Sequence, residues 1–218
     1  MSYIPQEYWF KHGKTYKEEF QYNKKFELQE KILIGYLKNN LSVSPFSTVF
    51  ELGCGFGRIT KLLLSNFSNI TEYVAIDLSP HQIENAKKFV SPIPETKQQN
   101  LNLNFMVSSI QSFQIQKKYD LVLASEVLMH VLPYEIGGII RKLVGMSNEH
   151  VINIDWYEEP PATKAASHNF IHQYEKIYLN LSQVGSVNRI PIMKKASWLK
   201  SVDTKQSLFH ALVKKSNT

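Results

Sequence analysis

Short apolar runs alternate with longer amphipathic stretches along most of the chain. The apolar runs cover residues 48–52, 73–76, 103–107, 119–124 and 150–154. The run at 119–124 is apolar apart from one aspartate, as is typical of a strand buried on both faces. Strands that alternate with helices predict a parallel sheet covered by helices on both sides.

The stretches between these runs have apolar residues at helical spacing. Helices are predicted at 24–41, at 58–67, from Pro80 onward, at 133–144 and at 168–181. Two more strands, at 187–193 and 207–213, are joined by a connection too short for an ordinary crossover helix, so they are predicted to form an antiparallel pair. The pattern therefore predicts one α/β domain over residues 1–218. Its fold is a doubly wound, mostly parallel sheet of seven strands.

Two predicted segments can cover a ligand that binds to the sheet. Residues 1–43 are mainly helical and are predicted to form an N-terminal lid. Residues 157–184 follow the fifth strand and are predicted to form an insertion on the substrate side. Ligands of open α/β sheets bind beyond the carboxyl ends of the strands, next to such segments.

A glycine loop follows the first predicted strand, in the run Glu51-Leu52-Gly53-Cys54-Gly55-Phe56-Gly57. Glycines let the backbone adopt positive φ and approach a ligand closely. A dinucleotide-binding loop has the pattern G-x-G-x-x-G, which places a pyrophosphate on a helix N-terminus. Here Arg58 occupies the position of the last glycine, and the spacing is G-x-G-x-G. This argues against a dehydrogenase.

Asp77 closes the second predicted strand, twenty residues after Gly57. S-adenosylmethionine has no phosphate, but it carries an ammonium, a carboxylate, a sulfonium and a ribose diol. Carboxylates suit its ammonium and hydroxyl groups. The glycine spacing, with Glu51 two residues before the first glycine and Asp77 after the second strand, resembles the class I S-adenosylmethionine-dependent methyltransferases.

This resemblance implies a set of cofactor-binding residues. Asp77 corresponds to the acid that receives both ribose hydroxyls, and Leu78 to the hydrophobic residue against the adenine. Ser109-Ile110 stands where the family often has an aspartate that contacts the adenine, so a neutral contact is expected there. The remaining implied positions are Tyr16 in the lid, Glu51, Gly53, Cys54, Gly55 and Gly57 in the loop, and Ser125 and Glu126 after the fourth strand.

Two residues in or near these motifs, Cys54 and Asp120, have structural interpretations. Cys54 is expected to be a small packing residue beside the cofactor and not a nucleophile. Asp120, in the family-like stretch that leads to Ser125 and Glu126, is expected to hold the start of its strand and not the cofactor.

Methyl transfer requires donor and acceptor to be aligned, and a base only if the acceptor must lose a proton. His130, after the fourth strand, is the candidate base. Asp155, His168, His172 and Tyr174 are hypothesised to line the acceptor pocket. His168 and His172 are four residues apart, but the H-E-x-x-H order of a zinc site is absent, and the Glu126-x-x-Met129-His130 run lacks one carboxylate of a known metal-binding pattern. No metal site is predicted.

Composition changes this picture little. The net charge is +6, and residues 185–218 contain seven basic residues and one acid. These lysines lack the aromatic and arginine residues expected of a nucleic-acid groove. One cysteine excludes an internal disulfide, no apolar run approaches the ~20 residues of a membrane span, and no secretion signal is visible, so a cytoplasmic location is expected.

We therefore predict an S-adenosylmethionine-dependent methyltransferase that acts on a small-molecule or glycan-like acceptor. One alternative is an RNA or protein methyltransferase that uses the basic C-terminal region. The sequence Ser125-Glu126-Val127-Leu128 replaces the Asn/Asp-Pro-Pro-Tyr of the family's N-methyltransferases of amides and bases, which argues against that chemistry. Another alternative is a non-catalytic module that binds the cofactor.

Overall fold

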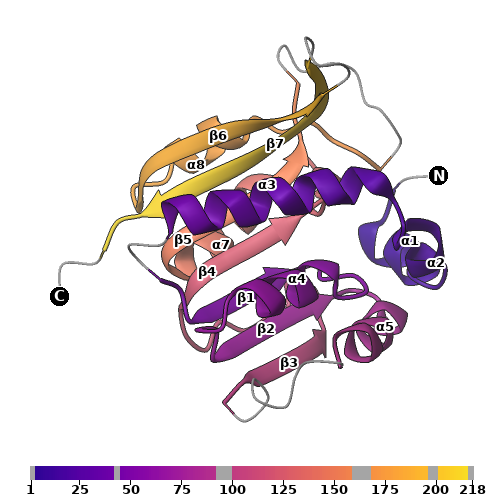
Figure 1. The fold of residues 1–218 in the computed structure, drawn as a ribbon. Helices are drawn as coiled ribbons and strands as arrows, with labels where there is room; N and C mark the ends of the chain where they lie inside the picture. Colours follow the sequence, from indigo (N-terminus) through magenta and orange to yellow (C-terminus); the bar gives the residue numbers. More distant parts are fainter. Residues whose placement is uncertain (1–2, 42–44, 92–99, 159–167, 196–200, 216–218) are drawn as a thin grey trace.

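The computed structural model describes residues 3–41, 45–91, 100–158, 168–195 and 201–215. A seven-stranded sheet has the order β3-β2-β1-β4-β5-β7-β6 (Figure 1). Its strands are β1 (Thr48–Leu52), β2 (Glu72–Asp77), β3 (Asn102–Val107), β4 (Tyr119–Ser125), β5 (Ser147–Trp156), β6 (Val184–Lys195) and β7 (Ser201–Val213). The first five strands are parallel, and β7 is antiparallel to both β5 and β6. The predicted fold class is confirmed.

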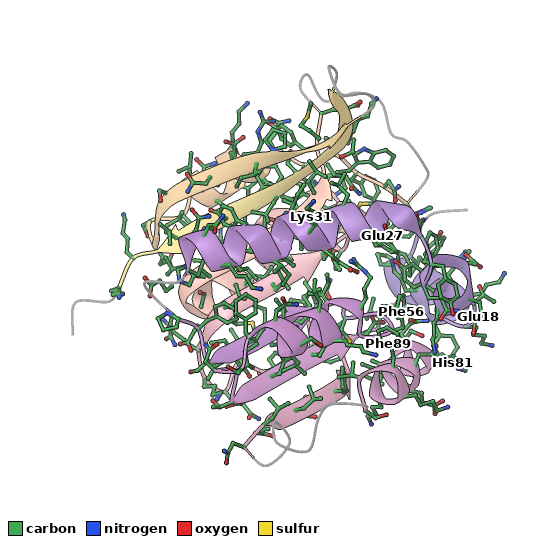
Figure 2. The ribbon with its side chains drawn as sticks, in the orientation of Figure 1. Glu18, Glu27, Lys31, Phe56, His81 and Phe89 are labelled. Atoms are coloured by element: carbon green, nitrogen blue, oxygen red, sulfur yellow. The ribbon has the colours of Figure 1, made fainter. Side chains whose placement is uncertain are left out.

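Helices cover both faces of the sheet (Figure 1). One face carries α3 (Lys24–Asn40), α4 (Arg58–Asn66) and α5 (Pro80–Val90), and the other carries α7 (Ile136–Gly145) and α8 (Tyr174–Leu179). On α3, the exposed residues Glu27 and Lys31 lie one turn apart, away from the sheet (Figure 2). Their spacing is the (i, i+4) pairing that supports a solvent-facing side of a helix.

Two cores form because side chains of a strand alternate between its faces. Val49 of β1 and Leu121 of β4 pack on the face of α3, α4 and α5. Their neighbours Phe50 and Val122 pack on the face of α7 and α8. All four side chains are completely buried. The apolar run predicted to be buried on both sides is therefore the centre of the molecule.

The N-terminal region consists of three helices, whereas the sequence pattern predicted one mainly helical segment. α1 (Pro5–His12) and α2 (Tyr16–Phe20) precede α3. They lie beside the ends toward which the parallel strands point (Figure 1). This position agrees with that of a lid over the carboxyl ends of the strands.

The predicted helix at 168–181 is wrong in its first half. Helix α8 begins only at Tyr174, and residues 168–173 follow an irregular path. The backbone N–H of Phe170 donates to the carbonyl of Met129 at 2.7 Å, which takes it out of any helical ladder. His168 and His172 therefore do not share a helix face. The helix predicted at 133–144 also starts later, at Ile136.

Asp120 joins the starts of β1 and β4. Its Oδ2 accepts the backbone N–H groups of Ser47 and Thr48, both at 3.0 Å, and its Oδ1 accepts the Asn148 amide at 3.1 Å. Burial alone would raise the pKa of Asp120, but the hydrogen bonds to the carboxylate outweigh burial and hold the pKa below its ordinary value. The expectation that Asp120 holds its strand and not the cofactor agrees with these contacts.

We predict that Asp120→Asn lowers the free energy of unfolding by about 1–3 kcal/mol at pH 7, because hydrogen bonds to a charged acceptor are weakened. A lowered pKa contributes stability above the ordinary aspartate pKa of about 3.9, and this stability is lost as the pH falls through the folded-state value. Urea unfolding should therefore show a gap between wild type and variant that narrows below about pH 4. Glu84→Gln, at an exposed position of α5, is the control. A gap independent of pH would contradict the prediction.

Candidate cofactor and active site

A cavity lies at the carboxyl ends of β1, β2 and β4, under the N-terminal helices. Gly53 and Gly55 of the glycine loop, Asp77 and Leu78 after β2, and Glu126 after β4 line it. The lid contributes Pro5, Trp9, Gly13 and Tyr16. This is where open α/β sheets bind their ligands.

The glycine loop has the left-handed backbone that its sequence predicts. Gly53, Gly55 and Gly57 have φ values of +67°, +52° and +86°. A Cβ on Gly53 would lie 2.4 Å from a methyl carbon of Val127, so only glycine fits against the segment after β4. A Cβ on Gly55 would be 3.8 Å from the Tyr16 ring and 3.9 Å from Gln82. Gly55 therefore faces the cavity and the lid, where a ligand would contact the backbone.

Asp77 connects the loop to the next helix. Its Oδ2 accepts the N–H of Gly55 at 2.9 Å, and its Oδ1 accepts the N–H of Ser79 at 2.8 Å. Burial raises the pKa of Asp77, and these N–H groups oppose that effect. Each carboxylate oxygen can accept further hydrogen bonds, so Asp77 can receive a diol from the cavity.

Glu51 and Cys54, both implied to bind cofactor, lie below the loop. The Glu51 carboxylate accepts the hydroxyls of Thr60 at 2.5 Å and Tyr73 at 2.7 Å, and it is 2% exposed. Burial raises the pKa of both the Glu51 carboxyl and the Cys54 thiol. Among the described residues, neither they nor Gly57 belong to the cavity lining. Their contacts are those of groups that shape the loop from beneath.

The segment after β3 lines the end of the cavity next to Leu78. Ser108, Ile110 and Gln111 line the cavity there. The Ser109 hydroxyl instead accepts the N–H of Ser112 at 3.0 Å. The polar side chains that line this end of the cavity are therefore those of Ser108 and Gln111, which were not predicted from the sequence.

Two buried polar atoms of the cavity wall lack a hydrogen-bond partner within the described ranges. They are the Ser125 hydroxyl oxygen and Oε1 of Gln82. Buried polar groups without a partner cost stability, and natural proteins rarely leave them so. With Asp77 and the open face of Gly55, they form a site that fits a ligand rich in amino, hydroxyl and amide-like groups, as S-adenosylmethionine is.

The N-terminal helices are tied to this site by side chains. Gln82 of α5 donates through Nε2 to the carbonyl of Gly13. The Tyr16 ring lies against Phe56 of the glycine loop, which contacts Phe89 of α5 (Figure 2). Burial, and next the charge of Glu126, raises the pKa of Tyr16 well above its ordinary value, so its hydroxyl is neutral.

Comparisons with known proteins identify this arrangement. A family model described as a methyltransferase domain matches residues 50–147. With the glycine loop and the sheet order, this match agrees with the resemblance to class I S-adenosylmethionine-dependent methyltransferases that the sequence predicts.

Individual relatives agree with the family match. A malonyl-[acyl-carrier protein] O-methyltransferase of Anoxybacillus flavithermus is 29% identical over 104 residues, which are 48% of this chain and 36% of the relative. A ubiquinone biosynthesis O-methyltransferase of Rickettsia akari is 32% identical over 83 residues, 38% of this chain and 30% of the relative. The chain spans 26–36% of the length of the first curated relatives that it matches.

The fold is also that of a solved methyltransferase. The structure of the N-methyltransferase NodS from Bradyrhizobium japonicum, in complex with S-adenosyl-L-homocysteine, superposes with a TM-score of 0.71. It is 16% identical, and the match covers 97% of this chain and 100% of that one. At this identity the likeness shows the shared fold. In the described ranges, each helix is too short or too polar to traverse a bilayer.

Within the residues that match the family model, His130 lies in a short 3-10 turn, Leu128–His130, and lines the cavity. Its ring contacts Trp9 of the lid, with centroids 4.7 Å apart. Its Nδ1 is 3.0 Å from the carbonyl oxygen of His168. Because a carbonyl can only accept, Nδ1 carries the proton of the neutral ring and Nε2 is its basic nitrogen.

The other hypothesised acceptor residues surround this turn. Asp155 accepts the N–H of Met129 at 3.1 Å, and Nε2 of His172 lies 3.0 Å from the carbonyl of Val131. Tyr174 packs against His172 and is completely buried. Within the described residues, Asp155, His168, His172 and Tyr174 do not line the cavity. The structure brings them together as supports of the His130 turn.

Sequence reasoning missed several cavity residues. Four of them come from four different segments of the chain: Trp9, Gln82, Gln111 and Glu135. A signal existed for Gln82, which stands three residues after Ser79, the N-cap of α5, and so at the capping-box position. Its side chain does not return to the cap but bridges to the lid. Trp9 belonged to the lid segment, but nothing in the pattern distinguished it from its aromatic neighbours.

We predict that Gly55→Ala weakens binding of S-adenosylhomocysteine at least tenfold, because the new methyl group projects toward the ligand. The melting temperature should fall only modestly, since a left-handed alanine costs about 1–2 kcal/mol and the space beside it is open. Gly53→Ala should instead lower the melting temperature strongly through its overlap with Val127. Calorimetry and thermal melts of both variants measure these effects. Equal melting temperatures for the two variants would refute this distinction.

Burial raises the pKa of Asp155 to about 7. A carboxyl whose folded-state pKa lies above the ordinary value of about 3.9 binds more protons when folded, so its contribution to stability falls as the pH rises from about 4 to about 7. We predict that the free energy of unfolding of wild type, measured relative to Asp155→Asn, declines over this interval by at most about 1.4 kcal/mol per pH unit. Urea titrations at several pH values test this, and a constant difference would disprove it.

Proposed function

We propose that this domain transfers the methyl group of S-adenosylmethionine to an oxygen of a small-molecule acceptor, with His130 as the base. The observation that carries the proposal is the position of His130 on the cavity wall, with Nδ1 held by the His168 carbonyl at 3.0 Å. This contact leaves Nε2 as the nitrogen that can take a proton.

The bound cofactor supplies a methyl carbon activated by the sulfonium. The acceptor oxygen would bond to that carbon while the sulfur–carbon bond breaks with its electrons to sulfur, and Nε2 of His130 would take the acceptor's proton. Asp77 would hold the ribose hydroxyls, and Leu78, Ile110 and Gln111 would hold the adenine. Alignment of this kind can be worth ~7–11 kcal/mol.

Several features support a small acceptor. The cavity is covered by α1 and α2, and Trp9 closes it over His130. The curated relatives named above are O-methyltransferases by name, which favours oxygen over nitrogen as the accepting atom. Among the described residues, the acceptor end presents the imidazole of His130 and the carboxylate of Glu135. No described lysine or arginine lines the cavity to bind an RNA backbone.

The acceptor can be identified with methyl-labelled S-adenosylmethionine and a cell extract separated into small-molecule, RNA and protein fractions. We expect label in the small-molecule fraction, on an oxygen. Label confined to RNA or protein would overturn the proposed substrate class. Binding of S-adenosylhomocysteine without any transfer would show a non-catalytic module, and no binding at millimolar ligand would overturn the cofactor assignment.

We predict that His130→Gln lowers kcat about 100-fold or more, as expected when a general base is removed. Affinity for S-adenosylhomocysteine should stay within about threefold of wild type, because the base acts on the acceptor. His81→Gln, at an exposed position of α5 (Figure 2), is the matched control and should retain full activity. Unchanged kcat in His130→Gln would remove His130 from the mechanism.

A further inference from the structure

Four polar side chains from four elements form one continuous chain of hydrogen bonds that ends at the cavity. Arg58 at the start of α4 donates to Gln29 of α3 at 3.4 Å, and Gln29 donates to Gln206 of β7 at 2.9 Å. Gln206 then donates to Oε1 of Glu126 at 2.6 Å. Glu126 lines the cavity, whereas Gln29 and Gln206 lie behind it and outside the matched residues 50–147.

The backbone is strained on both sides of the Gln206–Glu126 hydrogen bond. Lys205 and Glu126 are the two non-glycine residues with positive φ in the described ranges, at +59° and +57°. The carbonyl of Lys205 accepts the N–H of Tyr157 at 2.9 Å, and the N–H of Glu126 donates to Ile154 at 2.6 Å. Strained residues that cluster at a site persist only where their surroundings require them. Here the two strained residues, Glu126 and Lys205, are at or next to the residues that form the Gln206–Glu126 hydrogen bond.

The chain of hydrogen bonds ends beside the glycine loop and not beside the adenine end of the cavity. Val127, next to Glu126, lies against Gly53. The charges of Glu126 and Arg58 both act on the Tyr16 hydroxyl, so the three groups lie near one another. The Gln29 side chain is completely buried, and Arg58 stacks over the Phe26 ring at 4.0 Å, so neither is a loose surface group.

We infer that Gln206 and Gln29 are positioning residues that aim the Glu126 carboxylate at the ammonium of the cofactor's amino-acid end. The inference rests on the proposed cofactor use but not on the acceptor or on His130. Two oxygens of a carboxylate can be used at once. The Gln206 amide holds Oε1, and Glu126 lines the cavity, so the carboxylate is kept in one orientation at the cavity wall. A carboxylate with that fixed direction binds an ammonium more strongly than one that must first be ordered.

Two ligands separate this role from a general structural one. S-adenosylhomocysteine carries the amino-acid end, and 5′-methylthioadenosine shares its adenosine but lacks that end. In Gln206→Leu we expect the affinity for S-adenosylhomocysteine to fall about tenfold, the size of one lost hydrogen bond to a charged group. The affinity for 5′-methylthioadenosine should stay within twofold. Calorimetry at pH 7 measures both, and Gln183→Leu, at an exposed position, is the matched control.

An equal loss for both ligands, or no loss for either, would overturn the inference while leaving the proposed function intact. If wild type binds neither ligand, the proposed function itself fails. A second comparison keeps the test decisive should Gln206→Leu fold poorly. The double variant Glu126→Gln, Gln206→Glu restores a carboxylate–amide hydrogen bond but moves the charge away from the cavity. It should regain melting temperature over Glu126→Gln yet still bind S-adenosylhomocysteine weakly, and recovery of that affinity would contradict the inference.

Discussion

The site depends on the hydrogen bonds that the Asp77 carboxylate makes to backbone N–H groups of two different loops. One oxygen holds Gly55 in the glycine loop, and the other holds Ser79 before α5. A buried carboxylate must be satisfied by such donors, because its desolvation is costly otherwise. The same arrangement extends to the lid, since Gln82 of α5 binds the carbonyl of Gly13. The loop, the helix and the lid are therefore positioned together.

Much of this fold can be predicted from the alternation of apolar runs and amphipathic stretches. The antiparallel last pair follows from a connection too short for a crossover helix. The segment 168–173 could not be predicted in this way. Its apolar spacing is compatible with a helix, but Phe170 makes its hydrogen bond to Met129, which lies 41 residues earlier in the chain. Local spacing carries no information about a partner so distant, and here the tertiary contact determined the conformation.

The sequence predicts which segments form the site better than it predicts which side chains of those segments reach the cavity. Glu51 stands two residues before the first glycine, but strand alternation places it on the same face as Val49, toward α4, where Thr60 binds it. This alternation can be read from the sequence, and it predicts that the Glu51 side chain lies below the loop. The contact of Gln206 with Glu126 has no such signal, because it depends on the left-handed backbone at Lys205 and on a strand eighty residues further along the chain.

The short segment after β4 has to satisfy two requirements at once. Glu126, at its start, faces the glycine loop, and its orientation is set from behind by β7 and α3. His130 follows four residues later, and its orientation is fixed from the other side. Asp155 accepts the N–H of the neighbouring Met129, and the carbonyl of His168 accepts Nδ1 of His130. The two side chains share one short stretch of backbone, which largely determines the distance between them. In the proposed mechanism this is the distance between the cofactor's amino-acid end and the base. Methyl transfer is sensitive to such alignment, which gives a physical reason for supporting the segment by hydrogen bonds on both sides.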